Sequence, residues 1–405
     1  MKPIVRAGRM KPVHSDIRGP LFVEAMKRQK QGIDILKLNT GNPATFGFGL
    51  PDSIKNALME HMQDGVGYCD FKGMPQARQA ICDYETSKGI KGITSDDVFI
   101  GNGVSEVVSF ALTPLLNDGD EVLVPSPSYS LWGNSIYLEG GKPIFYTCDE
   151  KANWYPDIKD IRSKITDKTK AIVIINPNNP TGVLYPKELL LEIIQIARES
   201  GLLIFADEIY DRLVMDGKQH ISLASLTEDV PVITLNGLSK SHCLCGYRCG
   251  WMVISGPREL TEDYRQGIIQ LTSLRLCANT MAQIVIPAAL DDMETPASMV
   301  RPGGRIYEQR EATVRELEKI DGLSFVKNDA AFYVFPKLDV KKFNITNDKQ
   351  FAHDLLDVTN ILLVPGSGFD WKDPDHFRIV MLPQADILSD AIRRMGTFLD
   401  GYKQK

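Results

Sequence analysis

The feature that most constrains this chain is an alternation of short apolar runs with longer helical patterns between about residues 95 and 255. The runs are rich in Val, Ile and Leu, which is typical of strands buried on both faces. They fall at residues 98–100, 121–124, 143–147, 171–175, 202–206, 232–235 and 251–254. Between two of them, residues 187–200 carry apolar side chains at helical spacing, and the pattern ends near Gly201. We therefore expect an α/β fold with a mostly parallel sheet covered by helices on both faces.

The pattern changes past about residue 290, where Pro302-Gly303-Gly304 interrupts the chain. Helices are predicted over residues 305–320 and 349–358, and strands over 330–335 and 361–364. This mixture of predicted helices and short strands is typical of a smaller α+β domain. We expect an N-terminal arm with part of a small domain over residues 1–45, a large domain over 46–290, and the small C-terminal domain over 291–405.

The composition argues against several classes of protein. The chain has 405 residues and a formal net charge of -6, which gives no reason to expect nucleic acid as a partner. Its longest apolar runs, such as 171–175, fall far short of the roughly 18 residues that span a membrane. The basic N-terminal residues resemble a solvated arm more than a secretory signal or an organellar transit peptide. The 7 cysteines fit reduced thiols, so we expect a cytoplasmic protein.

Polar residues gather where the predicted strands end. They are Gly103-Val104-Ser105, Ser126-Pro127-Ser128-Tyr129, Asn176 to Gly182, Asp207-Glu208-Ile209-Tyr210, and Ser239-Lys240 with Arg248. In open α/β sheets, ligands bind outside the carboxyl ends of the strands. We therefore expect these clusters to form one shared site.

The strongest single string is Leu238-Ser239-Lys240, followed shortly by Arg248. A lysine just after an apolar strand is partly desolvated, which lowers the pKa of its ammonium and makes the amine available for Schiff-base chemistry. Arg248 can give bidentate hydrogen bonds to a phosphate or carboxylate. A Ser-Lys pair near a strand is ordinary when it occurs alone, so this reading depends on its context.

Two other strand ends carry polar groups with both a structural and a functional reading. Asn176 to Gly182 is rich in the residues that form plain turns, yet its prolines also fix the backbone and aim Asn179 at whatever lies above the strand. Asp207 at the tip of an apolar strand is either a helix N-cap or a carboxylate that needs a cation or a donor as partner. A cationic partner for Asp207 is the sharper hypothesis.

A metal site is not expected from the group His242, Cys243, Cys245 and Cys249. Their spacing matches neither Cys-x2-Cys nor Cys2His2 patterns. Small buried thiols are the better account of these cysteines.

Taken together, the motifs resemble one family along nearly the whole chain. The strings that carry the likeness are Asp16-Ile17-Arg18-Gly19-Pro20, Leu38 to Pro43, Ile100 to Glu106, Asn236 to Lys240, and Phe377-Arg378-Ile379-Val380. They are similar to those of the pyridoxal 5'-phosphate (PLP) dependent class I/II aminotransferases of fold type I, and more narrowly to bacterial alanine aminotransferases that use glutamate and pyruvate. The resemblance implies a seven-stranded, mostly parallel sheet between helices.

The resemblance also assigns roles around the cofactor ring. Lys240 would form the Schiff base with PLP and shuttle a proton during the reaction. Asp207 would keep the ring nitrogen protonated, which makes the ring an electron sink. Asn179 and Tyr210 would hydrogen-bond the phenolic oxygen. Tyr129 would stack on the ring, although a lone Tyr is as often an interface aromatic.

A second group of residues is implied for the cofactor phosphate. Val104 and Ser105 would open a helix whose free amide groups bind an anion. Arg248 and Ser239 would contact the same phosphate, and Tyr68 would reach it from the partner subunit of a homodimer. Many relatives have a phosphate-binding Ser three residues before the lysine, where this chain has Gly237.

For the substrate, the resemblance implies that Arg378 binds the α-carboxylate with help from Asn179 and the backbone of Gly41. Arg378 taken alone reads as a surface or salt-bridged Arg. Arg18 is the candidate ligand for the second carboxylate of glutamate, although an Arg in an N-terminal arm is otherwise usually solvated.

These residues predict a ping-pong transamination between L-glutamate and pyruvate that gives L-alanine and 2-oxoglutarate. The alternatives are transfer from other amino acids, namely aspartate, aromatic or branched-chain ones, or a PLP-dependent β-lyase or decarboxylase of the same fold. A PLP-binding regulator without turnover is a further alternative, but such proteins carry a DNA-binding domain, and no basic N-terminal domain of that size is present in this sequence.

Overall fold

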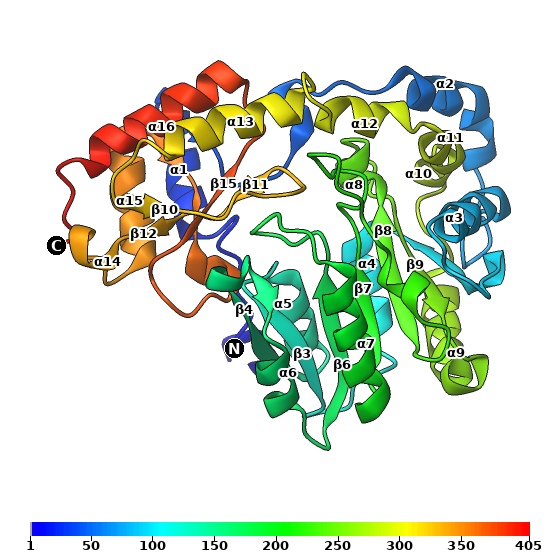
Figure 1. Ribbon diagram of the computed structural model, residues 1–405. Helices are drawn as coiled ribbons and strands as arrows, with labels where there is room; N and C mark the ends of the chain where they lie inside the picture. The colour runs from blue at the N-terminus through cyan, green and yellow to red at the C-terminus, as the bar shows by residue number, and fades with distance from the viewer. Residues whose placement is uncertain (1) are drawn as a thin grey trace.

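The computed structural model describes residues 2–405, and its largest sheet contains all the strands predicted from the apolar runs (Figure 1). The order of this sheet is β2-β9-β8-β7-β6-β3-β4-β5. Its strands are β2 (Val98–Gly101), β3 (Glu121–Ser126), β4 (Lys142–Asp149), β5 (Tyr155–Pro156), β6 (Thr169–Ile175), β7 (Leu203–Asp207), β8 (Val232–Gly237) and β9 (Gly250–Ser255). Strand β9 runs antiparallel to its neighbours β2 and β8, whereas β8, β7, β6, β3 and β4 run parallel. The mostly parallel sheet is confirmed, and the sequence reading missed the two-residue strand β5, which is antiparallel to β4.

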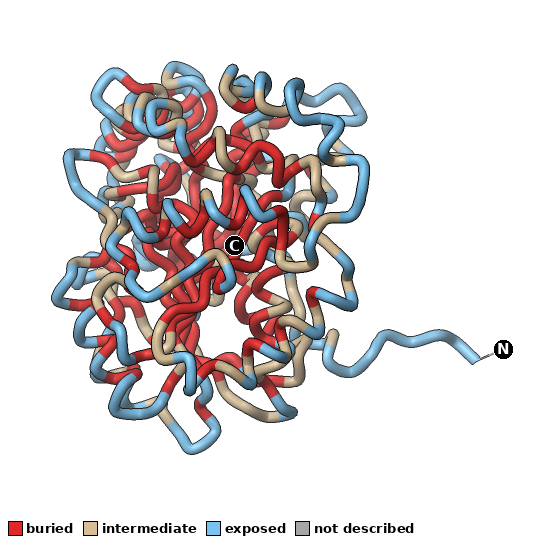
Figure 2. Tube along the Cα trace, turned by 90° about the vertical axis from the view of Figure 1, so that its right-hand side faces the viewer, coloured by how far each residue is buried: buried red, intermediate tan, exposed pale blue. Residues whose placement is uncertain are grey.

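Strand β6 shows why the central strands are apolar throughout. Its Ile172 and Ile174 pack into a cluster with side chains of α7 (Lys187–Ser200), whereas Val173 and Ile175 pack into another cluster with α4 (Val104–Leu112) and α5 (Leu131–Leu138). Successive side chains of a strand point to opposite faces. Both faces of the sheet are therefore covered by helices, and Figure 2 shows the buried chain in the interior of the molecule.

The helix predicted over residues 187–200 is confirmed as α7, and it ends where expected. Gly201 follows it with φ 64, a left-handed conformation that favours glycine. The remaining helices of the first part of the chain are α1 (Pro20–Lys30), α2 (Asp52–His61), α3 (Pro75–Ser87), α6 (Ile158–Lys164), α8 (Leu238–Ser241) and α9 (Arg258–Arg275). Those that follow are α10 (Thr280–Ile284), α11 (Ile286–Asp291), α12 (Glu294–Val300), α13 (Arg305–Leu317), α14 (Val340–Phe343), α15 (Asp348–Thr359) and α16 (Ala385–Leu399).

No single helix within residues 2–405 is long and apolar enough to cross a membrane. By length and composition alone, one bent pair passes the same test, formed by Arg258–Arg275 and Thr280–Asp291 at an angle of 119°.

The C-terminal part has its own core and small sheets. Helices α13 and α16 pack side by side (Figure 1), and a cluster that includes Leu317, Phe351, Phe377 and Ile392 lies beneath them. The strands here are β1 (Leu36–Lys37), β10 (Leu323–Ser324), β11 (Tyr333–Val334), β12 (Lys337–Leu338), β13 (Ile361–Leu362), β14 (Val364–Pro365) and β15 (Phe377–Val380). Strand β1 pairs in parallel with β13, which brings Leu36 and Lys37 beside these C-terminal strands. The domain limits themselves stay a prediction.

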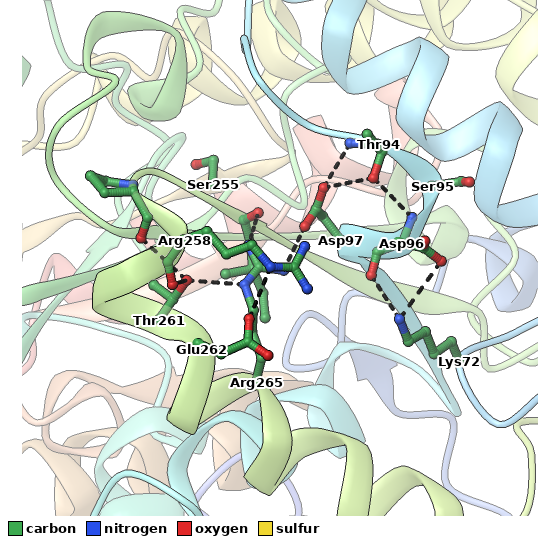
Figure 3. Close-up of polar contacts among 12 residues, drawn as sticks. Lys72, Thr94, Ser95, Asp96, Asp97, Ser255, Arg258, Thr261, Glu262 and Arg265 are labelled. Atoms are coloured by element: carbon green, nitrogen blue, oxygen red, sulfur yellow. Dashed lines mark hydrogen bonds and ion pairs between the residues drawn. The ribbon is translucent and has the colours of Figure 1, made fainter.

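A buried ion pair fastens the outer edge of the large sheet (Figure 3). The guanidinium of Arg265 on α9 lies 2.5 Å from Asp97 Oδ1, and it also donates to the Ile254 carbonyl oxygen at 3.0 Å. The second oxygen of Asp97 accepts from the amide and hydroxyl of Thr94. Both charged side chains are nearly inaccessible to water, so each depends on the other for its charge balance.

We expect Asp97→Asn to lower the free energy of unfolding by about 3 kcal/mol, because it leaves the Arg265 charge buried without a counter-ion. Urea unfolding followed by circular dichroism would measure this. The control is Glu262→Gln, which removes the exposed partner of Arg258 in the same region and should change the midpoint little. Equal effects of the two substitutions would contradict this account.

Candidate active site

Asp207 lies at the carboxyl end of β7, with its side chain buried in the protein. Its Oδ2 accepts a hydrogen bond from the Trp132 indole N–H at 3.1 Å, and Oδ1 accepts a long one from the Ile209 amide at 3.4 Å. Burial raises the pKa of Asp207 to about 6, although Trp132, Ile209 and the charge of Lys240 act in the opposite direction. No helix begins at Asp207, because residues 209–212 form a turn, so the N-cap reading is wrong. The carboxylate meets two neutral donors, and a cationic partner for it stays a prediction.

Lys240 lies in the short helix α8, directly after β8. Its Nζ donates to the carbonyl oxygen of Gly41 at 2.9 Å and lies 4.0 Å from Cys245 Sγ. The expected lowering of its pKa is wrong for this arrangement: burial lowers the pKa of Lys240, but the neighbouring side chains of Tyr333, Cys245 and Tyr129 act in the opposite direction and the net direction is upward. The lysine is therefore held as a cation inside the protein.

Tyr210 reaches the same region through a pair of tyrosines. Its hydroxyl lies 2.9 Å from that of Tyr333 on β11, and the two rings pack edge to face. A Cβ atom at Gly41 would lie 2.4 Å from the Tyr333 hydroxyl, so glycine is needed where this loop passes Tyr333. Gly41, Tyr210 and Lys240 are thus brought together as predicted.

Arg378 lies on β15 and is buried, contrary to the reading of it as a surface residue. Its guanidinium donates to Asn179 Oδ1 at 2.9 Å and to the Asn39 carbonyl oxygen. It also lies over the rings of Tyr333 and Phe369, at 4.5 and 4.6 Å from their centroids. Within residues 2–405 it has no carboxylate partner, its Nε has no hydrogen-bond acceptor, and burial lowers the pKa of Arg378. A buried cation of this kind favours an incoming anion.

A second cationic position lies at the start of α4. Gly103 precedes this helix with φ 85, and a Cβ atom there would lie 2.2 Å from Arg248 Nη2. A Cβ atom at Gly250 would lie 2.3 Å from the Val104 amide nitrogen. These glycines let Arg248 and the first amides of α4 lie side by side. The first amides of a helix have no intrahelical partner, so this corner is suited to an anion.

Gly237 has a physical reason to be glycine. A Cβ atom at this position would lie 2.6 Å from the Cys249 carbonyl oxygen and 3.0 Å from Gly250 Cα. A serine would therefore collide with the backbone of β9. Ser239, which is partly buried, remains the serine beside Lys240.

Four sequence-predicted residues lie outside this contact network. Tyr129 is partly buried and close enough to influence the pKa of both Lys240 and Arg378. Ser105, Tyr68 and Arg18 are exposed. Their assigned roles stay predictions.

Sequence reasoning missed three residues that complete the site, namely Trp132, Tyr333 and Asn39. Tyr333 lies in a segment recognised as a strand, but nothing in that segment indicates which face its hydroxyl takes. Trp132 and Asp207 are brought together by the sheet rather than by any local motif. Asn39 contributes through its backbone, which carries no signal of residue type.

One other group in the described chain has the geometry of a metal site: Glu208, Asp211 and His220. The Lys88 ammonium lies 2.9 Å from Glu208 and 3.2 Å from Asp211. The position that a metal ion would take beside these carboxylates is thus occupied by a side-chain cation.

The family model described as aminotransferase class I and II matches residues 33–392. The chain belongs to the class I and II aminotransferases.

Individual relatives are similar to this aminotransferase in sequence and in structure along its full length. It is 50% identical over 404 residues to the glutamate-pyruvate aminotransferase AlaA of Haemophilus influenzae, with 100% of each chain covered. A crystal structure of an aminotransferase from Escherichia coli matches with a TM-score of 0.98 at 46% identity, covering 100% of both chains. The alanine aminotransferase from Pyrococcus furiosus matches with a TM-score of 0.92 at 40% identity, covering 98% of this chain and 100% of that one. The fold type I architecture is thereby confirmed.

Class I and II aminotransferases depend on PLP, and the residues of this aminotransferase fit that cofactor. PLP carries a phosphate at one end and a ring nitrogen that can be protonated at the other. The glycine-lined corner at Arg248 is suited to the phosphate, and a Cβ atom would fill it. The buried Asp207 carboxylate, whose raised pKa reports an unmet need for a cation, is suited to the ring nitrogen.

The raised pKa of Asp207 makes a testable prediction for the protein without cofactor. Between about pH 4 and 6 the folded protein holds a proton on Asp207 that the unfolded chain has lost, so the free energy of unfolding falls as pH rises through this window. Asp207→Asn removes this penalty. The variant should therefore be more stable than the wild type at pH 8, by about 2 to 3 kcal/mol, and the gain should vanish below pH 4.

Chemical unfolding at both pH values would measure this difference. The exposed Asp386→Asn is the control and should show no pH-dependent gain. A stability difference that is the same at pH 4 and pH 8 would count against an uncompensated Asp207 charge.

Proposed function

We propose that this aminotransferase moves the amino group between L-glutamate and pyruvate, giving L-alanine and 2-oxoglutarate by a ping-pong mechanism. The observation that carries the proposal is the buried Arg378, which has hydrogen bonds to Asn179 and Asn39 but no carboxylate partner within residues 2–405. An α-carboxylate is the anion that every amino acid and 2-oxo acid supplies. The choice of glutamate and pyruvate is supported by the names of full-length relatives at 45 to 50% identity.

In this proposal, the cofactor is held at both ends by the chain. Arg248, Ser239 and the first amides of α4 at Val104 and Ser105 would bind its phosphate, while Asp207 would face its ring nitrogen and Tyr129 its ring. When bound, PLP supplies a ring that withdraws electrons from the substrate Cα. Trp132 orients the Asp207 carboxylate from the other side.

Lys240 is the group that attaches the cofactor and carries the proton. Its Nζ sits 2.9 Å from the Gly41 carbonyl oxygen, at the point where Tyr333 and Cys245 also approach. With its amine free, Lys240 could accept the proton from the substrate Cα and return it. The hydrogen bond to the Gly41 oxygen holds the amine beside this loop.

Asn179 and Tyr210 act on the phenolic oxygen of the ring. The Oδ1 atom of Asn179 accepts from Arg378, which leaves its amide N–H free to donate elsewhere. The Tyr210 hydroxyl is oriented by Tyr333. Asn179 would therefore couple the site of the substrate carboxylate to the ring, because the same side chain contacts Arg378 and would donate to the phenolic oxygen.

Arg378, Asn179 and the backbone of Gly41 would bind the substrate α-carboxylate. Arg18 would bind the distal carboxylate of glutamate and turn aside for alanine. Arg18 is exposed, and its neighbour Ile17 is tied to the site because its carbonyl oxygen accepts from Asn39 Nδ2 at 2.8 Å.

We further propose a cytoplasmic homodimer in which Tyr68 crosses to the phosphate of the partner's cofactor. Several apolar side chains around it are exposed in the single chain, which supports an interface there. They are Met59, Met62, Val66, Leu274 and Leu276, and Tyr68 itself is 83% exposed.

Borohydride reduction of the PLP-loaded protein should fix the cofactor to the peptide that contains Lys240, as seen by mass spectrometry. Lys240→Ala should bind PLP without any such label, because it lacks the attacking amine. Lys218→Ala removes an exposed lysine and should label as the wild type does. A label on another lysine of the wild type would refute the assignment.

A screen of single half-reactions, followed by the visible spectrum of the cofactor, tests the substrate pair. Glutamate and alanine should convert the bound cofactor faster than the other standard amino acids, and pyruvate and 2-oxoglutarate should reverse the change. Arg18→Ala should raise KM for glutamate by about tenfold, because one charge-assisted contact is lost, and change KM for alanine little. Release of free ammonia would indicate a lyase instead, and equal losses for both substrates would exclude Arg18 as the distal ligand.

A further inference from the structure

A histidine in the N-terminal segment lies between two carboxylates close to the substrate site. His14 Nε2 lies 3.1 Å from Asp370 Oδ1, and Nδ1 lies 3.4 Å from Asp16 Oδ2. The two carboxylates are only 12% and 14% exposed, and each has one oxygen without a hydrogen-bond partner. The backbone of His14 is also fixed, because its amide donates to Asn134 Oδ1 at 3.1 Å and its carbonyl oxygen accepts from Asn134 Nδ2 at 2.6 Å.

Both carboxylates belong to segments that lie next to residues in contact with Arg378. Asp370 directly follows Phe369, whose ring packs on the Arg378 guanidinium. Asp16 lies against the same loop, since a Cβ atom at Gly368 would lie 2.8 Å from Asp16 Cβ. The next residue, Ile17, accepts from Asn39, whose own carbonyl oxygen accepts from Arg378. The His14 bridge therefore joins two segments that both lie beside the immediate contacts of Arg378: Asp16-Ile17 next to Asn39, and Gly368 to Asp370 with Phe369.

We propose that His14 is a positioning residue for the substrate site, because its imidazolium bridges Asp16 and Asp370 and holds residues 14–18, Arg18 included, against the loop that carries Phe369. The inference rests on the proposed function, in which Arg378 and Arg18 bind the substrate carboxylates. It adds a residue that touches neither substrate nor cofactor. Residues 2–9 are exposed and the chain start extends from the body of the molecule (Figure 2), whereas the short helix Gly8–Met10 already contacts α5, so the bridge is a further attachment of this N-terminal segment.

The charges around His14 favour its protonated form. They are the carboxylates of Asp16 in its own segment and of Asp370 after the loop. The ammonium of Lys349 on α15 lies 3.1 Å from Asp16 Oδ1 and acts in the opposite direction, because it is a like charge, and Tyr137 on α5 lies close enough to Asp370 that burial and this carboxylate together raise its pKa. The close approach of the Asp16 and Asp370 carboxylates raises the pKa of His14 to about 9, against the effect of burial. The bridge is therefore complete at neutral pH and is lost as pH rises through about 9, which leaves two neighbouring carboxylates without their shared cation.

The test compares three variants of the PLP-loaded enzyme. His14→Gln keeps hydrogen-bonding capacity and removes the charge, whereas His14→Lys keeps a cation. His353→Gln is the control, because it removes another histidine that is paired with a carboxylate, the exposed Asp357 on α15. The readouts are hydrogen exchange of residues 15–19 by mass spectrometry at pH 7, and kcat and KM for pyruvate in the second half-reaction.

His14→Gln should speed hydrogen exchange in residues 15–19 at least fivefold and raise KM for pyruvate roughly tenfold, with kcat within twofold of the wild type. His14→Lys should restore both values to within about twofold. In the wild type KM should rise as pH passes about 9, and His14→Lys should move that rise to higher pH. His353→Gln should change neither readout.

Faster exchange without a change in KM would overturn the positioning role, since the bridge would then hold the arm without serving the site. His14→Lys behaving like His14→Gln would overturn the charge bridge. Hydrogen exchange needs no substrate, so it tests the bridge even if the enzyme proves inactive with glutamate and pyruvate. Inactivity of the wild type with that pair would count against the proposed function alone.

Discussion

The guanidinium of Arg378 is the interaction centre on which the rest of the site depends. It is buried at the junction of three separate parts of the chain, with Asn179 on one side, Asn39 on another, and two aromatic rings across its faces. A cation without a counter-ion in such surroundings is costly, and its neighbours repay only part of that cost through neutral hydrogen bonds. The surrounding core is large enough to keep the folded protein stable despite this cost. Arg378 is left without the anion that would compensate its charge.

Asp207 presents the same situation with the opposite sign. Its carboxylate is buried at the end of β7, and burial raises its pKa to about 6 because only Trp132, one long amide contact and the more distant Lys240 oppose that effect. An anion beside Arg378 and a protonated ring nitrogen beside Asp207 would relieve both costs at once. The two buried charges therefore favour ligands that bring an anion to Arg378 and a cation to Asp207. Without such ligands they reduce the stability of the folded protein.

The sequence predicted the framework of this site well, and for a clear reason. The strands β6, β7 and β8 are apolar throughout, so their ends are easily located, and a parallel sheet must bring those ends to one edge. That argument placed Asp207 and Lys240 together with Asn179. The burial of Arg378 was harder to predict. It depends on β11, β14 and β15, short strands whose pairing no local pattern specified.

Other features depend on contacts that sequence periodicity cannot express. The pKa of Lys240 is raised rather than lowered, because titratable side chains lie beside it, and one of them, Tyr333, is distant in sequence. Gly237 is glycine because β9 passes too close for a side chain, and this is visible only once β8 and β9 are paired. The His14 bridge joins His14 to Asp370, which are 356 positions apart in the sequence.

The most direct test of the central claim is a crystal structure of the PLP-loaded protein with a bound dicarboxylate that does not react. The account predicts that one carboxylate of this ligand accepts two hydrogen bonds from the Arg378 guanidinium, with Asn179 still in contact and Phe369 and Tyr333 unmoved. A ligand whose carboxylates bind elsewhere, with Arg378 still bonded only to Asn179 and Asn39, would contradict it.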